Sequence, residues 1–157
     1  MSMSDSAGIS FQTIVAAIDF SDITVKVLDA AKVMASQQNA RLLIVHVGPT
    51  EAQFVGYGKF IYPDPEERER ELLAEEEMLK GHAEAVRMEG VDSTAYLIHG
   101  EVAPTILRFS REHGADLIVM GTHGHNFLSS VLLGSVAEGV VRKTSIPVLT
   151  IPANKDD

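Results

Sequence analysis

The chain has 157 residues, of which 45% are hydrophobic and 22% are charged, a composition typical of one compact domain with a sizeable core. Its formal net charge of -9, from 22 acidic and 13 basic residues, disfavours a nucleic-acid partner, because general DNA binding needs basic surface to displace counterions. The absence of cysteine excludes disulfides, thiolate metal ligands and a cysteine nucleophile.

The N-terminal part of the sequence predicts a flexible start, a strand and a helix. Residues 1–10 are small and polar, and they have neither the basic nor the apolar region of a secretory signal. Residues 13–18 are apolar on both faces, which is typical of a parallel strand covered on both sides. Ser21 and Asp22 are suitable N-caps for a helix that extends to about Gln38.

The middle of the sequence repeats this alternation. Residues 41–47 predict a second buried strand, and residues 48–63 predict a loop that contains glycines and aromatic residues without a clear period. Asp64 and Pro65 have the types expected at the N-cap and first position of a helix that ends near Gly90. We interpret the glutamate-rich face of that helix as solvated surface.

The last third of the sequence contains the remaining strands and helices. Strands are predicted at 94–100, 116–121 and 146–152, and helices at 102–114 and 135–144. Strands that alternate with helices imply right-handed crossovers and a parallel sheet. We therefore predict one doubly wound α/β domain over residues 11–153, with five parallel strands and helices on both faces. No apolar stretch reaches the roughly 20 residues of a membrane span, so we expect a cytoplasmic protein without a membrane partner.

In a doubly wound sheet, ligands bind beyond the carboxyl ends of the strands, where the connections change from one face to the other. Asp19 directly follows the first predicted strand. Its carboxylate is suited to accept a hydrogen bond from a ligand, to ligate a metal or to help cap the next helix. Its position alone leaves these alternatives open.

The stretch from Gly121 to Val136 is a second candidate, because it joins the fourth strand to the next helix. Its glycines would allow backbone N–H groups to approach phosphate oxygens, and Ser135 is placed to cap the helix. The helix N-terminus also favours negative charge. The stretch is neither a Walker A loop nor a G-x-G-x-x-G motif. The chemistry leaves phosphate binding and a structural turn as equal alternatives.

The glycine spacing resembles that of a known family. Gly121-x-x-Gly124, nine further residues and Gly134-Ser135 are similar to the G-2x-G-9x-G-(S/T) signature of ATP-binding universal stress proteins. The resemblance extends over about residues 10 to 152. It implies a Rossmann-like fold, bound ATP or another adenine nucleotide, Mg²⁺ arriving with that nucleotide, and a role in stress responses. It also implies a homodimer formed by pairing of the last strand, Pro147 to Ile151.

Site residues follow from the same resemblance, position by position. Asp19 and the backbone near Ala17 and Val47 are implied to hold the adenine and the adjacent ribose. The residues implied to surround the ribose and phosphates are Met120, Gly121, His123, Gly124, His125 and Asn126, with Gly134, Ser135 and Val136 at the helix start. Ala17 departs from the family pattern, since many ATP-binding members have proline there.

The same stretch bears on catalysis and on metal binding. No lysine or arginine lies between Gly114 and Arg142, although ATP hydrolysis requires neutralisation of the γ-phosphate charge. We therefore predict no catalytic residue and no efficient ATPase. The pair His123 and His125 has no nearby third ligand in the sequence, so no transition-metal site is predicted.

Three functions remain as hypotheses from the sequence. The leading one is an ATP-binding regulatory module in which bound nucleotide orders the segment 121–134 and so changes a surface for an unidentified protein partner. The alternatives are a slow ATPase or autophosphorylating enzyme, and a nucleotide-free dimeric scaffold.

Overall fold

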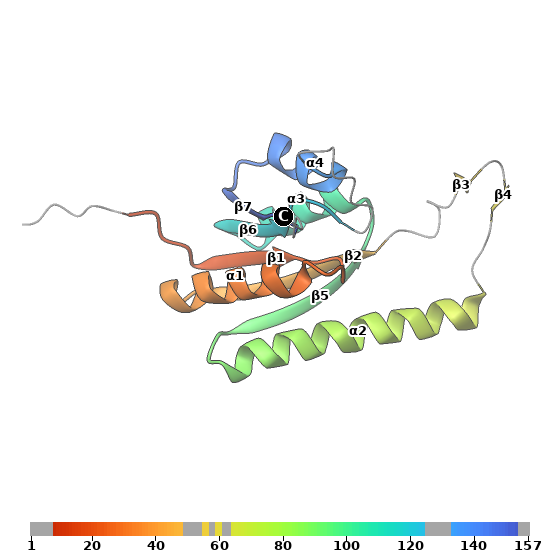
Figure 1. Cartoon of the computed structure of the whole chain (residues 1–157), viewed down its shortest axis with the longest axis horizontal. Helices are drawn as coiled ribbons and strands as arrows, with labels where there is room; N and C mark the ends of the chain where they lie inside the picture. The colour runs from red at the N-terminus through yellow and green to blue at the C-terminus, as the bar shows by residue number, and fades with distance from the viewer. Residues whose placement is uncertain (1–7, 49–54, 57–58, 61–63, 125–132, 154–157) are drawn as a thin grey trace, which may run out of the picture.

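The computed structural model describes residues 8–48, 55–56, 59–60, 64–124 and 133–153, and its framework is a five-stranded parallel sheet. The strand order is β5-β2-β1-β6-β7, with β1 at the centre (Figure 1). The strands are β1 (Thr13–Ala17), β2 (Arg41–Gly48), β5 (Ser93–His99), β6 (Leu117–Gly121) and β7 (Val148–Ile151). The predicted fold class is confirmed.

Two helices cover each face of the sheet. The helices α1 (Thr24–Gln38) and α2 (Pro65–Met88) lie on one face, and α3 (Val102–Glu112) and α4 (Ser135–Lys143) lie on the other (Figure 1). None of the helices in the described part of the chain combines the length and apolar character needed to cross a membrane.

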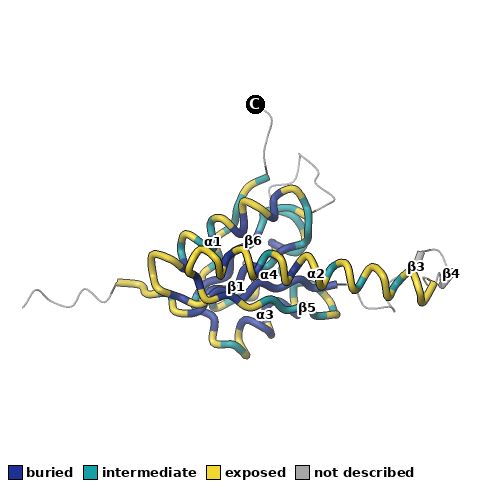
Figure 2. The backbone as a smooth tube through the Cα atoms, turned by 90° about the horizontal axis from the view of Figure 1, so that it is seen from below, coloured by how far each residue is buried: buried dark blue, intermediate teal, exposed yellow. Residues whose placement is uncertain are grey.

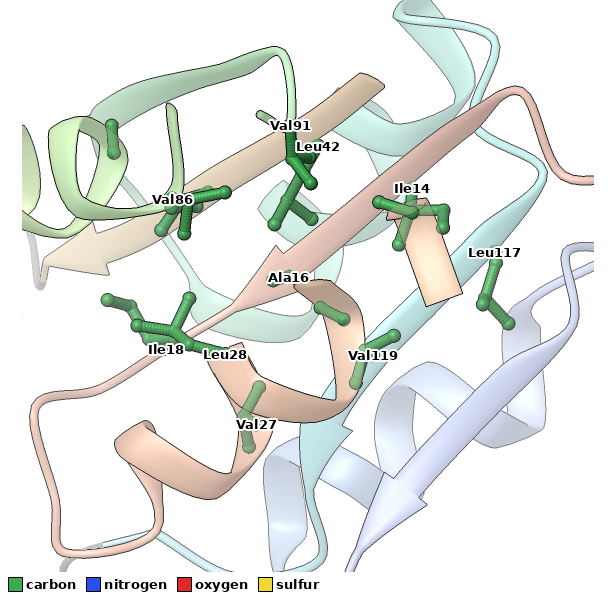
Figure 3. Packing of buried hydrophobic residues seen from close by; sticks show 14 of the residues in the cluster. Ile14, Ala16, Ile18, Val27, Leu28, Leu42, Val86, Val91, Leu117 and Val119 are labelled. Carbon is green, nitrogen blue, oxygen red and sulfur yellow. The ribbon is translucent and has the colours of Figure 1, made fainter. Parts of the chain in front are cut away.

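The central strand explains why both faces must be covered. Ile14, Val15 and Ala16 of β1 are completely buried, and β1 is drawn mostly in the dark blue of buried residues in Figure 2. Successive side chains of a strand point to opposite faces. Ile14 and Ala16 therefore pack toward α1 and α2 (Figure 3), whereas Val15 packs toward α3 and α4. A strand that is apolar on both faces is stable only between two helical layers.

The start of α1 corrects one prediction. Ser21 and Asp22 do not cap this helix, because it begins at Thr24 and the N-cap position is Ile23, for which no side-chain cap is described. The preceding turn is closed by other groups instead. The Ser21 carbonyl accepts the N–H of Thr24 at 3.0 Å, and the Asp19 carboxylate accepts the N–H of Ser21 at 3.0 Å.

The segment before α2 corrects a second prediction. Residues 48–63 were expected to be a loop, but they contain a short antiparallel pair, β3 (Val55–Gly56) and β4 (Lys59–Phe60). A two-residue strand is too short for its alternation of side chains to be visible in the sequence.

The helix α2 begins as predicted, with the Asp64 carboxylate accepting the N–H of Glu66 at 3.1 Å. Its buried side chains, Leu79, Ala83 and Val86, all belong to the C-terminal half. The N-terminal half extends beyond the sheet (Figure 1), and most of its described residues are exposed (Figure 2).

We expect Asp64→Ala to loosen the first turn of α2 without a measurable loss of global stability. Loss of an N-cap costs about 1 kcal/mol of local helix stability, which corresponds to roughly fivefold faster hydrogen exchange of the Glu66 and Arg68 amides. The global unfolding midpoint stays unchanged because this turn packs against little else. Asp64→Asn, which retains a capping side chain, is the control. A lower global unfolding midpoint for Asp64→Ala than for the wild type would contradict this prediction.

Candidate functional site

The carboxyl ends of β1, β2 and β6 border a cleft of about 520 Å³. From β1 the chain crosses toward β2 and β5 on one side, and it later returns to β6 and β7 on the other side. The point between β1 and β6 is therefore where the crossovers reverse direction, and such a point leaves a crevice between the diverging connections. The cleft lies where the strand order alone would place a ligand site.

The structure brings the predicted site residues together. Those that line the cleft are Ala17, Asp19, Val47, Met120, Gly121, His123, Gly124, Gly134, Ser135 and Val136. His125 and Asn126 lie outside the described residues. The lining residues that the sequence did not indicate are Ile18, Ile23, Thr24, Val27, Val102, Ile106, Thr122 and Ala137. Most of these belong to the first turns of α1, α3 and α4, which follow the strand ends and so face the same crevice.

Asp19 lies in a tight turn at one wall of the cleft. One carboxylate oxygen, Oδ1, accepts the Ser21 N–H, and the residue between them, Phe20, has a φ of +60°. A non-glycine residue in this left-handed region costs about 1–2 kcal/mol. The Phe20 ring packs on the buried imidazole of His46 with centroids 4.5 Å apart, and His46 Nδ1 is 2.8 Å from the Ile18 carbonyl oxygen. These contacts hold the turn, and with it Asp19, in place.

At the opposite wall, two glycines approach their neighbours closely. A Cβ on Gly124 would lie 2.8 Å from Oδ2 of Asp19. A Cβ on Gly134 would lie 3.1 Å from the Thr122 carbonyl oxygen and 3.3 Å from Cα of His123. Gly134 has φ -67° and ψ 163°, which any residue adopts, so it is close approach and not backbone freedom that favours glycine there.

The N-terminus of α4 supplies hydrogen-bond donors to the cleft. Ser135 was expected to cap this helix, but it is the first helical residue and Gly134 occupies the N-cap position without a side-chain bond. The N–H of Gly134 donates to the Thr122 carbonyl at 2.7 Å, so it is already used. The N–H groups of Ser135, Val136 and Ala137 have no acceptor within the helix, because the ladder starts with Glu138 donating to Gly134 at 2.9 Å.

The charges around the cleft are few. Within the part of the chain that the structure describes, the cleft is lined by one carboxylate, Asp19, and one imidazole, His123, and by no lysine or arginine. Across the same described residues, no group of three or more histidine, aspartate or glutamate side chains is placed to hold a metal ion. The donors available to an anion are therefore backbone N–H groups, hydroxyls and the imidazole.

Comparison with known proteins decides the family. The model of the universal stress protein family matches residues 10–152, which is nearly the whole chain. The chain belongs to the universal stress protein family. Among curated members, YxiE of Bacillus subtilis is 34% identical over 149 residues, covering 90% of this chain and 99% of the relative.

Solved structures of universal stress proteins have the same fold. One from Burkholderia pseudomallei is 33% identical with a TM-score of 0.70, covering 90% of this chain and 96% of that chain. Another, from Archaeoglobus fulgidus, was solved in complex with dAMP. It is 27% identical with a TM-score of 0.63, covering 88% of this chain and 96% of that chain.

Proposed function

We propose that this universal stress protein binds ATP in the cleft between β1 and β6 and acts as a nucleotide-dependent regulatory module in the cytoplasm. The observation that carries the proposal is the close approach at Gly124 and Gly134, which keeps side chains out of the space between the Asp19 turn and the start of α4. The dAMP complex of the Archaeoglobus fulgidus relative supports an adenine nucleotide.

The two ends of the cleft suit the two ends of a nucleotide. Ala17, Val47 and Met120 offer mainly apolar surface to the adenine ring, and the Asp19 carboxylate accepts hydrogen bonds from the adenine amine or a ribose hydroxyl. At the other end, the N–H groups of Ser135 and Val136 point from the start of α4 and bind phosphate oxygens.

Mg²⁺ fits this site as a companion of the phosphates. It neutralises phosphate charge, and it usually keeps several waters and binds through one or two carboxylates together with substrate phosphates. Asp19 is the one carboxylate among the described residues of the cleft, so phosphate oxygens and waters would supply most of the ligands.

We do not propose that the protein hydrolyses ATP rapidly. Rapid cleavage of ATP depends on cationic groups at the γ-phosphate, and the sequence has no lysine or arginine from residue 115 to residue 141. In a module that holds ATP without cleaving it, the signal is whether the cleft is occupied by nucleotide. Such a signal suits a regulatory role toward a protein partner.

The last strand supports a homodimer. β7 is an edge strand of the sheet, hydrogen-bonded to β6 on one side. Leu149 in its middle is 37% exposed. An apolar edge strand with unpaired backbone groups is suited to pair with a second copy, and we propose that residues 147–151 do so.

Calorimetric titration of nucleotide-stripped protein with Mg-ATP tests the binding. We expect one saturable site per chain, with tighter binding of ATP than of AMP because ATP brings two more phosphate groups to the donors at the start of α4. Asp19→Ala is expected to weaken ATP binding by about tenfold through loss of a hydrogen bond to a charged acceptor. Absence of heat beyond dilution in the wild type, with folded protein confirmed by circular dichroism, would refute the proposal.

A further inference from the structure

A second hollow, which we call the α1/α2 groove, lies between the two helices that cover one face of the sheet. Its described lining comes from both helices and from the C-cap residue of α2, and it includes Val25, Leu28, Lys32, Ala85, Val86 and Glu89. None of the described residues that line the groove also lines the cleft between β1 and β6. The groove is therefore a separate surface, although α1 contributes to both.

The groove has an apolar floor and apolar walls. Leu28 and Val86 are buried members of the core cluster that Figure 3 shows, so the floor is part of the packed core. Val25 is 62% exposed on the α1 side, and Ala85 is exposed on the α2 side. The volume of the groove is about 120 Å³, well below the roughly 300–1,000 Å³ of small-molecule sites. The groove therefore has room for an apolar side chain of another protein and not for a cofactor.

The rim of the groove carries two carboxylates and one ammonium. Nζ of Lys32 lies 2.8 Å from Oε2 of Glu89 and 3.4 Å from Oδ1 of Asp29. The hydrogen bond with Glu89 raises the pKa of Lys32, so its ammonium stays charged at neutral pH. Both carboxylates are more than half exposed, and Lys32 is the one lysine or arginine among the described residues that line the groove. One carboxylate is therefore in excess on an accessible rim.

We propose that the α1/α2 groove binds a basic, amphipathic segment of a partner protein, which places an apolar side chain against Val25 and Ala85 and a cationic side chain at the rim. Interfaces commonly seat an apolar anchor in a pocket and place charged groups around it, and a groove between helices receives such anchors from an amphipathic helix. The cation of the partner joins Lys32 at the carboxylates of Asp29 and Glu89, so charge complementarity selects a basic segment over an acidic one. The inference does not rest on the proposed nucleotide site, and its tests use protein free of nucleotide.

Titration of the ¹⁵N-labelled full-length protein with two synthetic peptides tests the inference. Both peptides have about 15 residues, a length at which helices become stable in water, and leucine on one helical face. The other face carries lysine in the first peptide and glutamate in the second. We expect the lysine peptide to bind saturably and to shift the amide signals of Val25, Asp29 and Glu89 most, and the glutamate peptide to bind at least about tenfold more weakly. Equal affinity for the two peptides, or no saturable shift up to about 1 mM of the lysine peptide, would overturn the inference.

Two arginine variants of α2 separate the groove from the general acidity of the chain. Ala85→Arg places a bulky cation in the groove and is expected to weaken binding of the lysine peptide at least about tenfold. Ala74→Arg adds the same charge at an exposed position of the same helix, outside the described lining of the groove, and is expected to bind within about twofold of the wild type. Circular dichroism checks that both variants are folded. An equal loss in the two variants would mean that the peptide responds only to overall charge, and it would overturn the inference.

A second copy of this chain is the alternative occupant of the groove. Dilution of the labelled protein without peptide is expected to leave the amide signals of Val25, Asp29 and Glu89 unchanged. Shifts of these signals with protein concentration would show that a second copy fills the groove, and they would overturn the inference in favour of self-association.

Discussion

Gly134→Val is expected to lower the affinity for Mg-ATP by at least about 100-fold, the equivalent of two charge-assisted hydrogen bonds of roughly 1.5 kcal/mol each. The new Cβ would lie 3.1 Å from the Thr122 carbonyl oxygen and 3.3 Å from Cα of His123. Both are backbone atoms, which cannot turn away as a side chain can. The start of α4 must therefore shift by a few tenths of an ångström, which we expect to take the N–H groups of Ser135 and Val136 away from the phosphates.

The matched control is Gly81→Val on the exposed surface of α2. Apart from its chain neighbours and the nearby backbone of α2 itself, no described atom lies within 4 Å of the position that a Cβ would take on Gly81. The same substitution there leaves the cleft unchanged, and valine has a better helix propensity than glycine. Calorimetry should give wild-type affinity for Gly81→Val, and circular dichroism should show that both variants are folded. Wild-type affinity for Gly134→Val would mean that the start of α4 does not contact the ligand.

Ile14→Ala is expected to lower the free energy of unfolding by about 3–4 kcal/mol, within the range measured for truncation of large buried aliphatic residues. Ile14 is completely buried in the central strand, and it is in register with Leu42 on β2 and Leu117 on β6. The three side chains lie in one row in the core cluster beneath α1 and α2 (Figure 3). Removal of the middle one leaves a cavity bounded by strands that hold one another in place.

Urea denaturation followed by circular dichroism measures this loss. Val33→Ala on α1 is the control, because Val33 is 49% exposed and its truncation should change the free energy of unfolding by less than about 0.5 kcal/mol. The fraction of Ile14→Ala that remains folded should bind ATP normally, since Ile14 lies outside the cleft lining. A loss below about 1 kcal/mol would show that the core relaxes around this position.

The fold could be predicted from the sequence because buried parallel strands have a clear hydrophobic pattern. A run such as residues 13–18, apolar on both faces, has few structural interpretations, and helices between such runs dictate right-handed crossovers. The N-caps of α1 and α4 were predicted wrongly for a physical reason. Serine and aspartate are common caps, but the turn before α1 is closed by the Ser21 carbonyl and the Asp19 carboxylate, next to Phe20, whose left-handed conformation has no sequence signal.

The sequence predicted which residues lie at the strand ends of the candidate site, but it did not predict the rest of the cleft lining. Glycine spacing and position after a strand indicated which residues gather at the sheet edge. Thr122 was overlooked because its place in the cleft wall depends on backbone hydrogen bonds with Ile151 and Gly134. These residues become its neighbours only through folding. The apolar lining next to α1 and in α3, such as Ile23 and Ile106, was overlooked because ordinary core residues have the same composition.

The pairing of β1 with β6 has a consequence for the order in which the molecule is assembled. Ile14 pairs with Leu117, so the two strands that border the cleft meet only after roughly 100 residues of intervening chain have closed into a loop. During synthesis, a chain that has emerged as far as β5 contains β1 and β2 but neither the segment 121–134 nor α4. The nucleotide that we propose for this cleft would therefore stabilise only the nearly complete domain, and it would act on the last step of folding and not on the first.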